Sequence, residues 1–148
     1  MTDRSICLGN LSVGDIFHAE YPNGASCICL VLSVNDAAIH AKRITTQQNL
    51  LFNRRTGVEE AAPGEPEAVI DSVAPLPPEV HDTFLEMNKK YEALMSMDKA
   101  SRFQDLERHK LTEAEKKALI FVYSHYASNA LPGTRADGNE ASVAYDGD

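Results

Sequence analysis

The residues whose types and spacing best suit chemistry lie between His40 and Arg55, a stretch with many hydrogen-bond donors and no acidic side chain. Guanidinium groups and threonine hydroxyls are the groups with which proteins recognise phosphate and carboxylate. The polar side chains of an exposed edge strand look similar in a sequence and bind nothing specific. The stretch predicts a basic rim that contacts an acidic protein or an anionic ligand, with these candidate binding residues: Lys42, Arg43, Thr45, Gln47, Arg54 and Arg55.

The same stretch also has a catalytic interpretation. In a ribonuclease that works by general acid–base chemistry, Arg43 or Arg54 would stabilise the charged phosphorane, and Thr46 or His40 would lie near the attacking hydroxyl. No phosphate-binding loop, dinucleotide fingerprint or nucleophile elbow accompanies these residues, because the eight glycines are scattered singly. We therefore favour a non-enzymatic binding or adaptor protein over an enzyme, and we expect no cofactor.

Composition limits the class of protein and its partners. The chain has 148 residues, a net charge of −8 and 43% hydrophobic residues, which is typical of one globular domain. Because the net charge repels nucleic acid at long range, nucleic acid is a less favoured partner than a protein or an anionic ligand. No apolar run approaches the ~18 residues of a membrane-spanning helix, and residues 1–10 do not read as a secretory signal. We expect a cytoplasmic protein without membrane contact.

The cysteines and histidines give little support for a metal site. Cys27 and Cys29, with His18 on the preceding strand, would bring three soft ligands together, but structural zinc sites use a two-residue spacer and a fourth ligand. No two of the five histidines have the spacing of four residues that a metal site on a helix uses. We therefore expect no metal ion, and reduced cysteines that pack inside a strand as small hydrophobic residues.

Residues 1–75 show the two-residue alternation of β-strands. Strands are expected from Leu11 to Tyr21 and from Ala37 to Ile44, and the first of them directs Phe17 inward and His18 outward. Residues 26–34 form a nearly continuous apolar run, which indicates a central strand, and short strands are expected at 49–53 and 68–73. Five short strands in about 60 residues suit a small SH3-like barrel or meander.

Helices are expected after Pro75, Pro77 and Pro78, which end the sheet. Apolar residues recur every three or four positions from 78 to 97, and Thr112 with Glu115 forms a capping box at the start of a final helix. The final helix is apolar around much of its circumference, so we expect it to be substantially buried. Whether Asp98 begins a separate helix over 98–110 is left open. The apolar stripe and the apolar residues of the final helix are Val80, Phe84, Met87, Tyr91 and Leu94, and Ala118, Leu119, Phe121, Val122, Tyr123 and Tyr126.

The expected organisation is an α+β protein in three parts. A barrel over 1–75 is followed by a helical segment over 76–131 that packs on it as one cooperative unit, and by a flexible acidic tail over 132–148. The helical stripe would also suit the seam of a homodimer, although we favour packing within one chain. A third functional hypothesis is a sensor of small anionic ligands, with a pocket between the barrel and the helix from 78 to 97.

Three short segments carry a resemblance to a known family. Gly14-Asp15-Ile16-Phe17, Leu30-Val31-Leu32-Ser33 and Thr45-Thr46-Gln47 resemble the start of MazF-like ribonuclease toxins. That family has an SH3-like barrel and cleaves single-stranded RNA without a metal, using an arginine and a threonine or serine. The resemblance covers at most the first third of the chain and implies a catalytic role for Thr45 or Thr46. Ser26-Cys27 stands where the family has Arg-Pro, so the catalytic arginine has no counterpart there.

Overall fold

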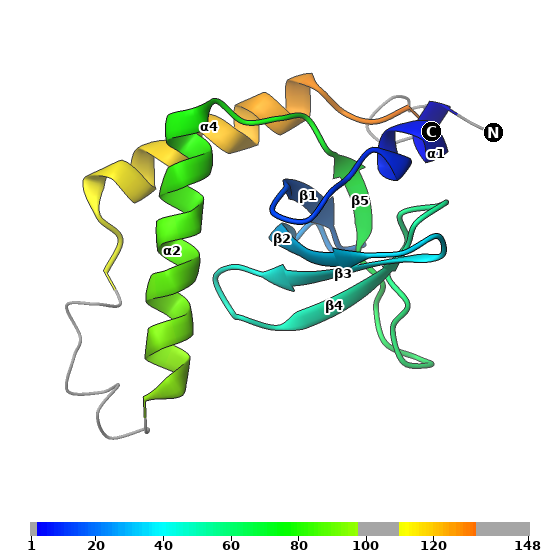
Figure 1. Ribbon diagram of the computed structural model, residues 1–148, viewed down its shortest axis with the longest axis horizontal. Helices are drawn as coiled ribbons and strands as arrows, with labels where there is room; N and C mark the ends of the chain where they lie inside the picture. The colour runs from blue at the N-terminus through cyan, green and yellow to red at the C-terminus, as the bar shows by residue number, and fades with distance from the viewer. Residues whose placement is uncertain (1–2, 98–109, 133–148) are drawn as a thin grey trace.

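The computed structural model describes residues 3–97 and 110–132 of the chain (Figure 1). Within these residues, five antiparallel strands form one sheet in the order β4-β3-β2-β1-β5, and the two described helices α2 and α4 follow it in the sequence. The prediction of an α+β protein with about five N-terminal strands and C-terminal helices is confirmed. The elements are α1 (Asp3–Gly9), β1 (Ile16–Glu20), β2 (Ser26–Val34), β3 (Ala38–Arg43), β4 (Asn49–Asn53), β5 (Val69–Ser72), α2 (Pro78–Ser96) and α4 (Glu113–Ser128).

The sheet curls into a half-barrel (Figure 1). The pairing register shifts between Val31 and Ser33 of β2, and again between His18 and Ala19 of β1, and such irregularities bend strands. The segment 57–59 then joins the two outer strands, because Glu59 bridges to Phe52 of β4 and Val58 bridges to Val69 of β5. The curled sheet thereby encloses an apolar interior.

Both faces of the central strands are buried, which creates two hydrophobic cores. Alternate residues of β1 and β2, such as Phe17 and Cys29, point into the half-barrel. Their neighbours Ile16 and Leu30 pack instead against the helices, with Met87 of α2. The predicted inward side of β1 is confirmed, but the expectation that His18 points outward is wrong, because helices cover that face and His18 is only 7% exposed.

The helix α2 stands beside the sheet, and α4 crosses α2 (Figure 1). The predicted stripe of α2 is confirmed, since Phe84, Met87 and Leu94 are buried. The predicted capping box is also confirmed. Thr112 Oγ1 accepts from the Glu115 backbone N–H at 3.1 Å, and Glu115 Oε1 accepts from the Thr112 N–H at 2.9 Å.

The expectation that the final helix is substantially buried is wrong. Only one side of α4 contacts the rest of the described protein, and it buries Ala118, Val122 and Tyr126. On the other side, Ile120 is 73% exposed and Tyr123 is 50% exposed. A helix that is apolar all round is buried only when other elements surround it, and here α2 and the sheet cover one side of α4.

The short helix α1 was not predicted from the sequence. Its Leu8 is fully buried in the interior of the half-barrel. Arg4 fixes the helix to the sheet, because its Nε donates to the Thr56 carbonyl at 2.8 Å and its Nη2 donates to the Ile70 carbonyl at 2.5 Å. Seven residues do not form a stable helix alone, so α1 depends on these tertiary contacts.

Two expectations fall on parts of the chain for which no structure is described. The tail over 132–148 lies outside the described residues except for Pro132, and the question of a helix over 98–110 lies outside them except for Lys110. Within the described ranges, no helix is both long and apolar enough to cross a membrane.

Candidate functional site

The structure divides the predicted basic rim among several places. Lys42 and Gln47 are half-buried, and both contact α2. Lys42 Nζ lies 3.2 Å from Glu92 Oε2, and Gln47 Nε2 donates to Asn88 Oδ1 at 2.9 Å. Because Asn88 and Glu92 lie one turn apart on one side of α2, these two rim residues hold the helix against the β3–β4 connection.

Arg54 has a structural role at the opposite end of β4. Its Nη2 donates to the carbonyls of Gly9 at 2.8 Å and Leu11 at 3.2 Å, and its Nη1 donates to the Asn35 carbonyl at 2.8 Å. The guanidinium therefore caps the end of α1 and ties it to the β2–β3 turn. Arg54 and its exposed neighbour Arg55 also line a pocket of about 380 Å³.

The four residues of the ribonuclease hypothesis are not brought together. Arg54 lines the smaller pocket, whereas Arg43 lines a different and larger one. Neither His40 nor Thr46 lines either of these pockets. Thr46 is exposed in the β3–β4 connection beside the exposed Thr45, and its Oγ1 accepts from the Gln48 N–H at 3.3 Å.

The three-ligand metal arrangement is also not formed. Cys27 and Cys29 are fully buried on the inner side of β2. His18 faces α4 instead, where its Nδ1 bonds Asp71 Oδ1 at 2.5 Å and its ring stacks on Tyr126 with centroids 5.5 Å apart. Among the residues the structure describes, no three His, Cys, Asp or Glu side chains gather as a metal ion would require. The predicted burial of the two strand cysteines is confirmed.

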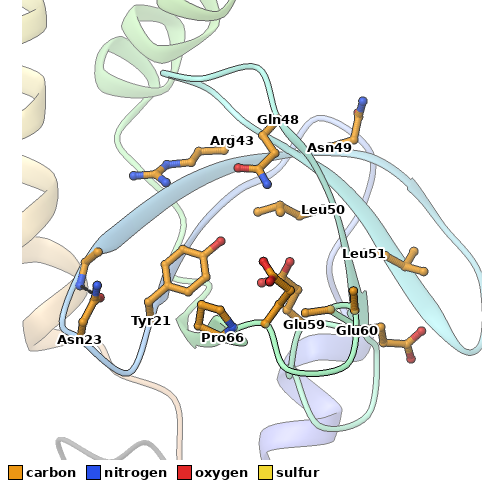
Figure 2. Close-up of a pocket in the computed structure, with 14 residues that line it drawn as sticks. Tyr21, Asn23, Arg43, Gln48, Asn49, Leu50, Leu51, Glu59, Glu60 and Pro66 are labelled. Carbon is orange, nitrogen blue, oxygen red and sulfur yellow. Dashed lines mark hydrogen bonds between the residues drawn. The ribbon is translucent and has the colours of Figure 1, made fainter.

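Arg43 belongs to the larger pocket, which has a volume of about 620 Å³. We call it the mouth pocket. It lies where the β1–β2 turn, the start of β4 and the 59–66 loop meet, and Figure 2 shows Tyr21, Gln48 and Glu59 directed toward its interior. Its lining residues are Tyr21, Asn23, Ala25, Arg43, Gln48, Asn49, Leu50, Leu51, Glu59, Glu60, Ala61, Ala62, Glu65 and Pro66.

Tyr21, in the wall of the mouth pocket, interacts with the fully buried Cys27 of β2. Burial, with Cys27 and Glu59 nearby, raises the pKa of Tyr21 to about 12. A hydrogen bond with Cys29 lowers the pKa of the Cys27 thiol to about 7 against the opposing effect of burial, and Arg43 lowers it further. The same hydrogen bond, together with burial, raises the pKa of Cys29. Since both cysteines are fully buried, this pair shapes the local charge but does not present a nucleophile to solvent.

Glu59 is the most unusual group of the pocket. Its side chain comes from the segment that closes the half-barrel, and the residue is only 9% exposed. Its Oε1 accepts from the Ala68 N–H at 3.1 Å. Across residues 3–97 and 110–132, no lysine, arginine or histidine nitrogen forms an ion pair with Glu59 within 4.0 Å. The residue is therefore mostly buried, and its carboxylate lines the open pocket with one described hydrogen bond and no described counter-ion.

The sequence identified Arg43 as a binding residue but did not identify Tyr21 or Glu59. Tyr21 adjoins the Pro22-Asn23-Gly24 turn, and its position at the end of a strand is the feature of the sequence that could have indicated its place in the pocket. Glu59 lies between the strands expected at 49–53 and 68–73, and nothing in the neighbouring sequence indicates that it folds back over β4. The pocket unites positions almost forty residues apart, so local pattern could not reveal it.

The fold and this pocket define a small α+β protein with a curled five-stranded sheet and a largely acidic pocket at one end. No family model, curated protein or solved structure matches the chain. These comparisons give no support to the resemblance to MazF-like toxins.

Proposed function

We propose that this protein is a non-enzymatic binding protein whose ligand occupies the mouth pocket. The observation that carries the proposal is the pocket itself, whose volume of about 620 Å³ falls in the range of ~300–1,000 Å³ typical of ligand sites. Apolar side chains such as Leu50 and Pro66 line it beside the hydroxyl of Tyr21 and the amide of Gln48. Apolar walls with a few directed polar groups are the usual composition of such sites.

The chemistry of the lining supports binding more than catalysis. A hydrolytic site needs a nucleophile or bound water, a base within hydrogen-bond reach of it, and donors aimed at the developing charge. All lining residues of the mouth pocket belong to the described part of the chain, and they include no serine, threonine, cysteine or histidine. Arg43 could stabilise negative charge, but its Nη2 already donates to the Ser26 carbonyl at 3.0 Å.

A pair of matched tryptophan variants tests the location of the site. Ala61→Trp places a large side chain in the mouth pocket, whereas Ala93→Trp places it on the exposed side of α2. Ligands are first sought by thermal shift against amines, short peptides, nucleotides and anionic metabolites, because a ligand of the folded state raises the melting temperature. We expect Ala61→Trp to abolish the shift and Ala93→Trp to preserve it. An unchanged shift in Ala61→Trp would place the ligand elsewhere.

The original rim hypothesis has its own test. If the three arginines form one interface, charge reversal at Arg43, Arg54 and Arg55 should weaken the binding of an acidic partner. Because Arg54 holds α1 in place, the comparison must include Arg43→Glu and Arg55→Glu as single variants that leave this structural arginine intact. Unchanged capture of an acidic partner by both single variants would reject the rim as the interface.

A further inference from the structure

Resting on the proposed function, we infer that the mouth pocket takes a positively charged group on an aliphatic stem, with Glu59 as its counter-ion. The chemical class is an alkyl ammonium or guanidinium, as on a lysine or arginine side chain of a peptide or on a free polyamine.

Glu59 places a carboxylate that is largely shielded from bulk water in the wall of the mouth pocket. An ionised carboxylate removed from water loses a large hydration energy, and proteins normally recover it through a paired cation and several hydrogen bonds. Glu59 has a single backbone donor, Ala68 N–H, and no ion pair with a described cation. A ligand cation in the pocket would supply the missing partner.

The lining of the mouth pocket as a whole is acidic. The lining includes three glutamates, Glu59, Glu60 and Glu65, and one arginine, Arg43, although Figure 2 shows the Glu60 carboxylate directed away from the centre of the pocket. Figure 2 shows the Arg43 guanidinium at the edge of the group, on the side of Asn23, while the Glu59 carboxylate lies between Tyr21 and Leu50. An anionic ligand would approach three like charges, whereas a cation is attracted by the lining and by the net charge of −8.

The remaining walls of the mouth pocket suit an alkyl stem. Leu50, Ala61 and Pro66 offer apolar surface, along which lysine and arginine stems commonly lie while the charged end reaches a polar partner. The ring of Tyr21 stands beside this space, and aromatic rings attract cations through their faces. Burial and the nearby Cys27 and Glu59 raise the pKa of Tyr21 to about 12, so its hydroxyl stays neutral, and a hydrogen bond with Cys27 holds it in the wall of the pocket.

The test is isothermal titration with defined probes. The probes are a capped Gly-Lys-Gly peptide, the same peptide with norleucine in place of lysine, the same peptide with glutamate, and spermidine. Norleucine keeps the aliphatic stem but has no charge, so it isolates the contribution of the ammonium. We expect the lysine peptide or spermidine to bind, and the norleucine and glutamate peptides to bind at least about tenfold more weakly. Binding of spermidine alone would identify a free amine, and binding of the peptide would identify a protein partner.

The variants isolate the role of Glu59. Glu59→Gln keeps the shape and an oxygen for the Ala68 N–H, whereas Glu86→Gln makes the same change on the exposed surface of α2. We expect about a tenfold or greater loss of affinity for the first variant and none for the second, since truncating one partner of a desolvated charge pair is costly. If Glu59→Gln fails to fold, the exposed pair Glu60→Gln and Glu65→Gln replaces it, with a smaller loss that grows at low salt.

The outcomes separate this inference from the proposed function. Equal affinity for the lysine and norleucine peptides, or unchanged affinity in Glu59→Gln, would overturn the inference that the ligand is a cation. A loss of affinity in Ala61→Trp would in that case still support the mouth pocket as the binding site. Failure of every cationic probe to bind would also overturn the inference. Binding that survives Ala61→Trp would reject both.

Discussion

Replacement of Arg54 tests whether this arginine serves the fold or a ligand. The sequence groups Arg54 with Arg55 as two binding residues, whereas the structure gives them different roles. Arg54 donates three hydrogen bonds to the carbonyls of Gly9, Leu11 and Asn35, and Arg55 is exposed. We therefore predict that Arg54→Ala destabilises the protein and that Arg55→Ala does not.

The magnitude follows from those three bonds. A hydrogen bond to a charged group contributes about 1.5–3 kcal/mol when well shielded and less when exposed. Two of the three bonds are exposed and one is part-buried, so a total loss of about 2–3 kcal/mol is expected. Removing Arg54 also removes its buried Nε, which has no described hydrogen-bond partner, and this keeps the estimate at the lower end. For a chain of this size the melting temperature should fall by about 5–10 °C.

Urea denaturation followed by circular dichroism provides the measurement, with Arg54→Lys as the matched variant. Lysine keeps the charge but lacks the planar guanidinium with which arginine reaches three carbonyls. Arg54→Lys should therefore recover less than half of the lost unfolding free energy. Equal stability of wild type and Arg54→Ala would refute the structural role. A similar loss in Arg55→Ala would show that general charge, rather than the cap of α1, controls stability.

Three further predictions concern the fold and the ionisable groups. Leu8→Ala should lower the free energy of unfolding by about 3 kcal/mol in urea titrations, because it leaves a cavity in the half-barrel interior; a cost under about 1 kcal/mol would show that α1 is not part of the core. Gln47 has a left-handed backbone with φ of 61°, so Gln47→Gly should relieve strain that offsets the lost bond to Asn88, whereas Gln47→Ala should cost about 2 kcal/mol; equal stability of the two variants would contradict this. The pKa of Cys27 is lowered from 9.0 to about 7, so its thiolate stabilises the fold fully above pH 9 and this contribution is lost as pH falls through 7; the gap in unfolding free energy between wild type and Cys27→Ser should therefore widen from pH 6 to pH 9, and a constant gap would reject the shift.

Much of the sheet could be predicted from the sequence because turn signals delimit its strands. The predicted bounds of the strands at 26–34 and 49–53 agree with β2 and β4. Pro22-Asn23-Gly24 and Asn35-Asp36 fix the ends of β2, and a continuous apolar run indicates its central position correctly. The helix α1 could not be predicted, because it is stabilised by burial of Leu8 and by Arg4, not by local propensity.

The candidate site was predictable only in part. The sequence indicates Arg43 as a binding residue because side chains that donate hydrogen bonds, and no acidic side chains, surround it. In the folded chain the 59–66 loop brings three glutamates to the same pocket, which reverses the local sign of the charge. Lys42 and Gln47 were available to a partner only if α2 left them exposed, and the sequence does not show that Asn88 and Glu92 meet them. Charge patterns along a chain therefore indicate a surface only when distant segments do not fold onto it.

The two-sided burial of β1 and β2 limits how this protein can be divided. The outward residues Ile16, Ile28 and Leu30 belong to the core shared with α2 and α4. A fragment ending at residue 75 would expose these side chains to water as a continuous hydrophobic surface. We expect such a fragment to self-associate on expression. The sheet and its helices should therefore be cloned and engineered as one unit. Fusion partners should be attached outside these elements.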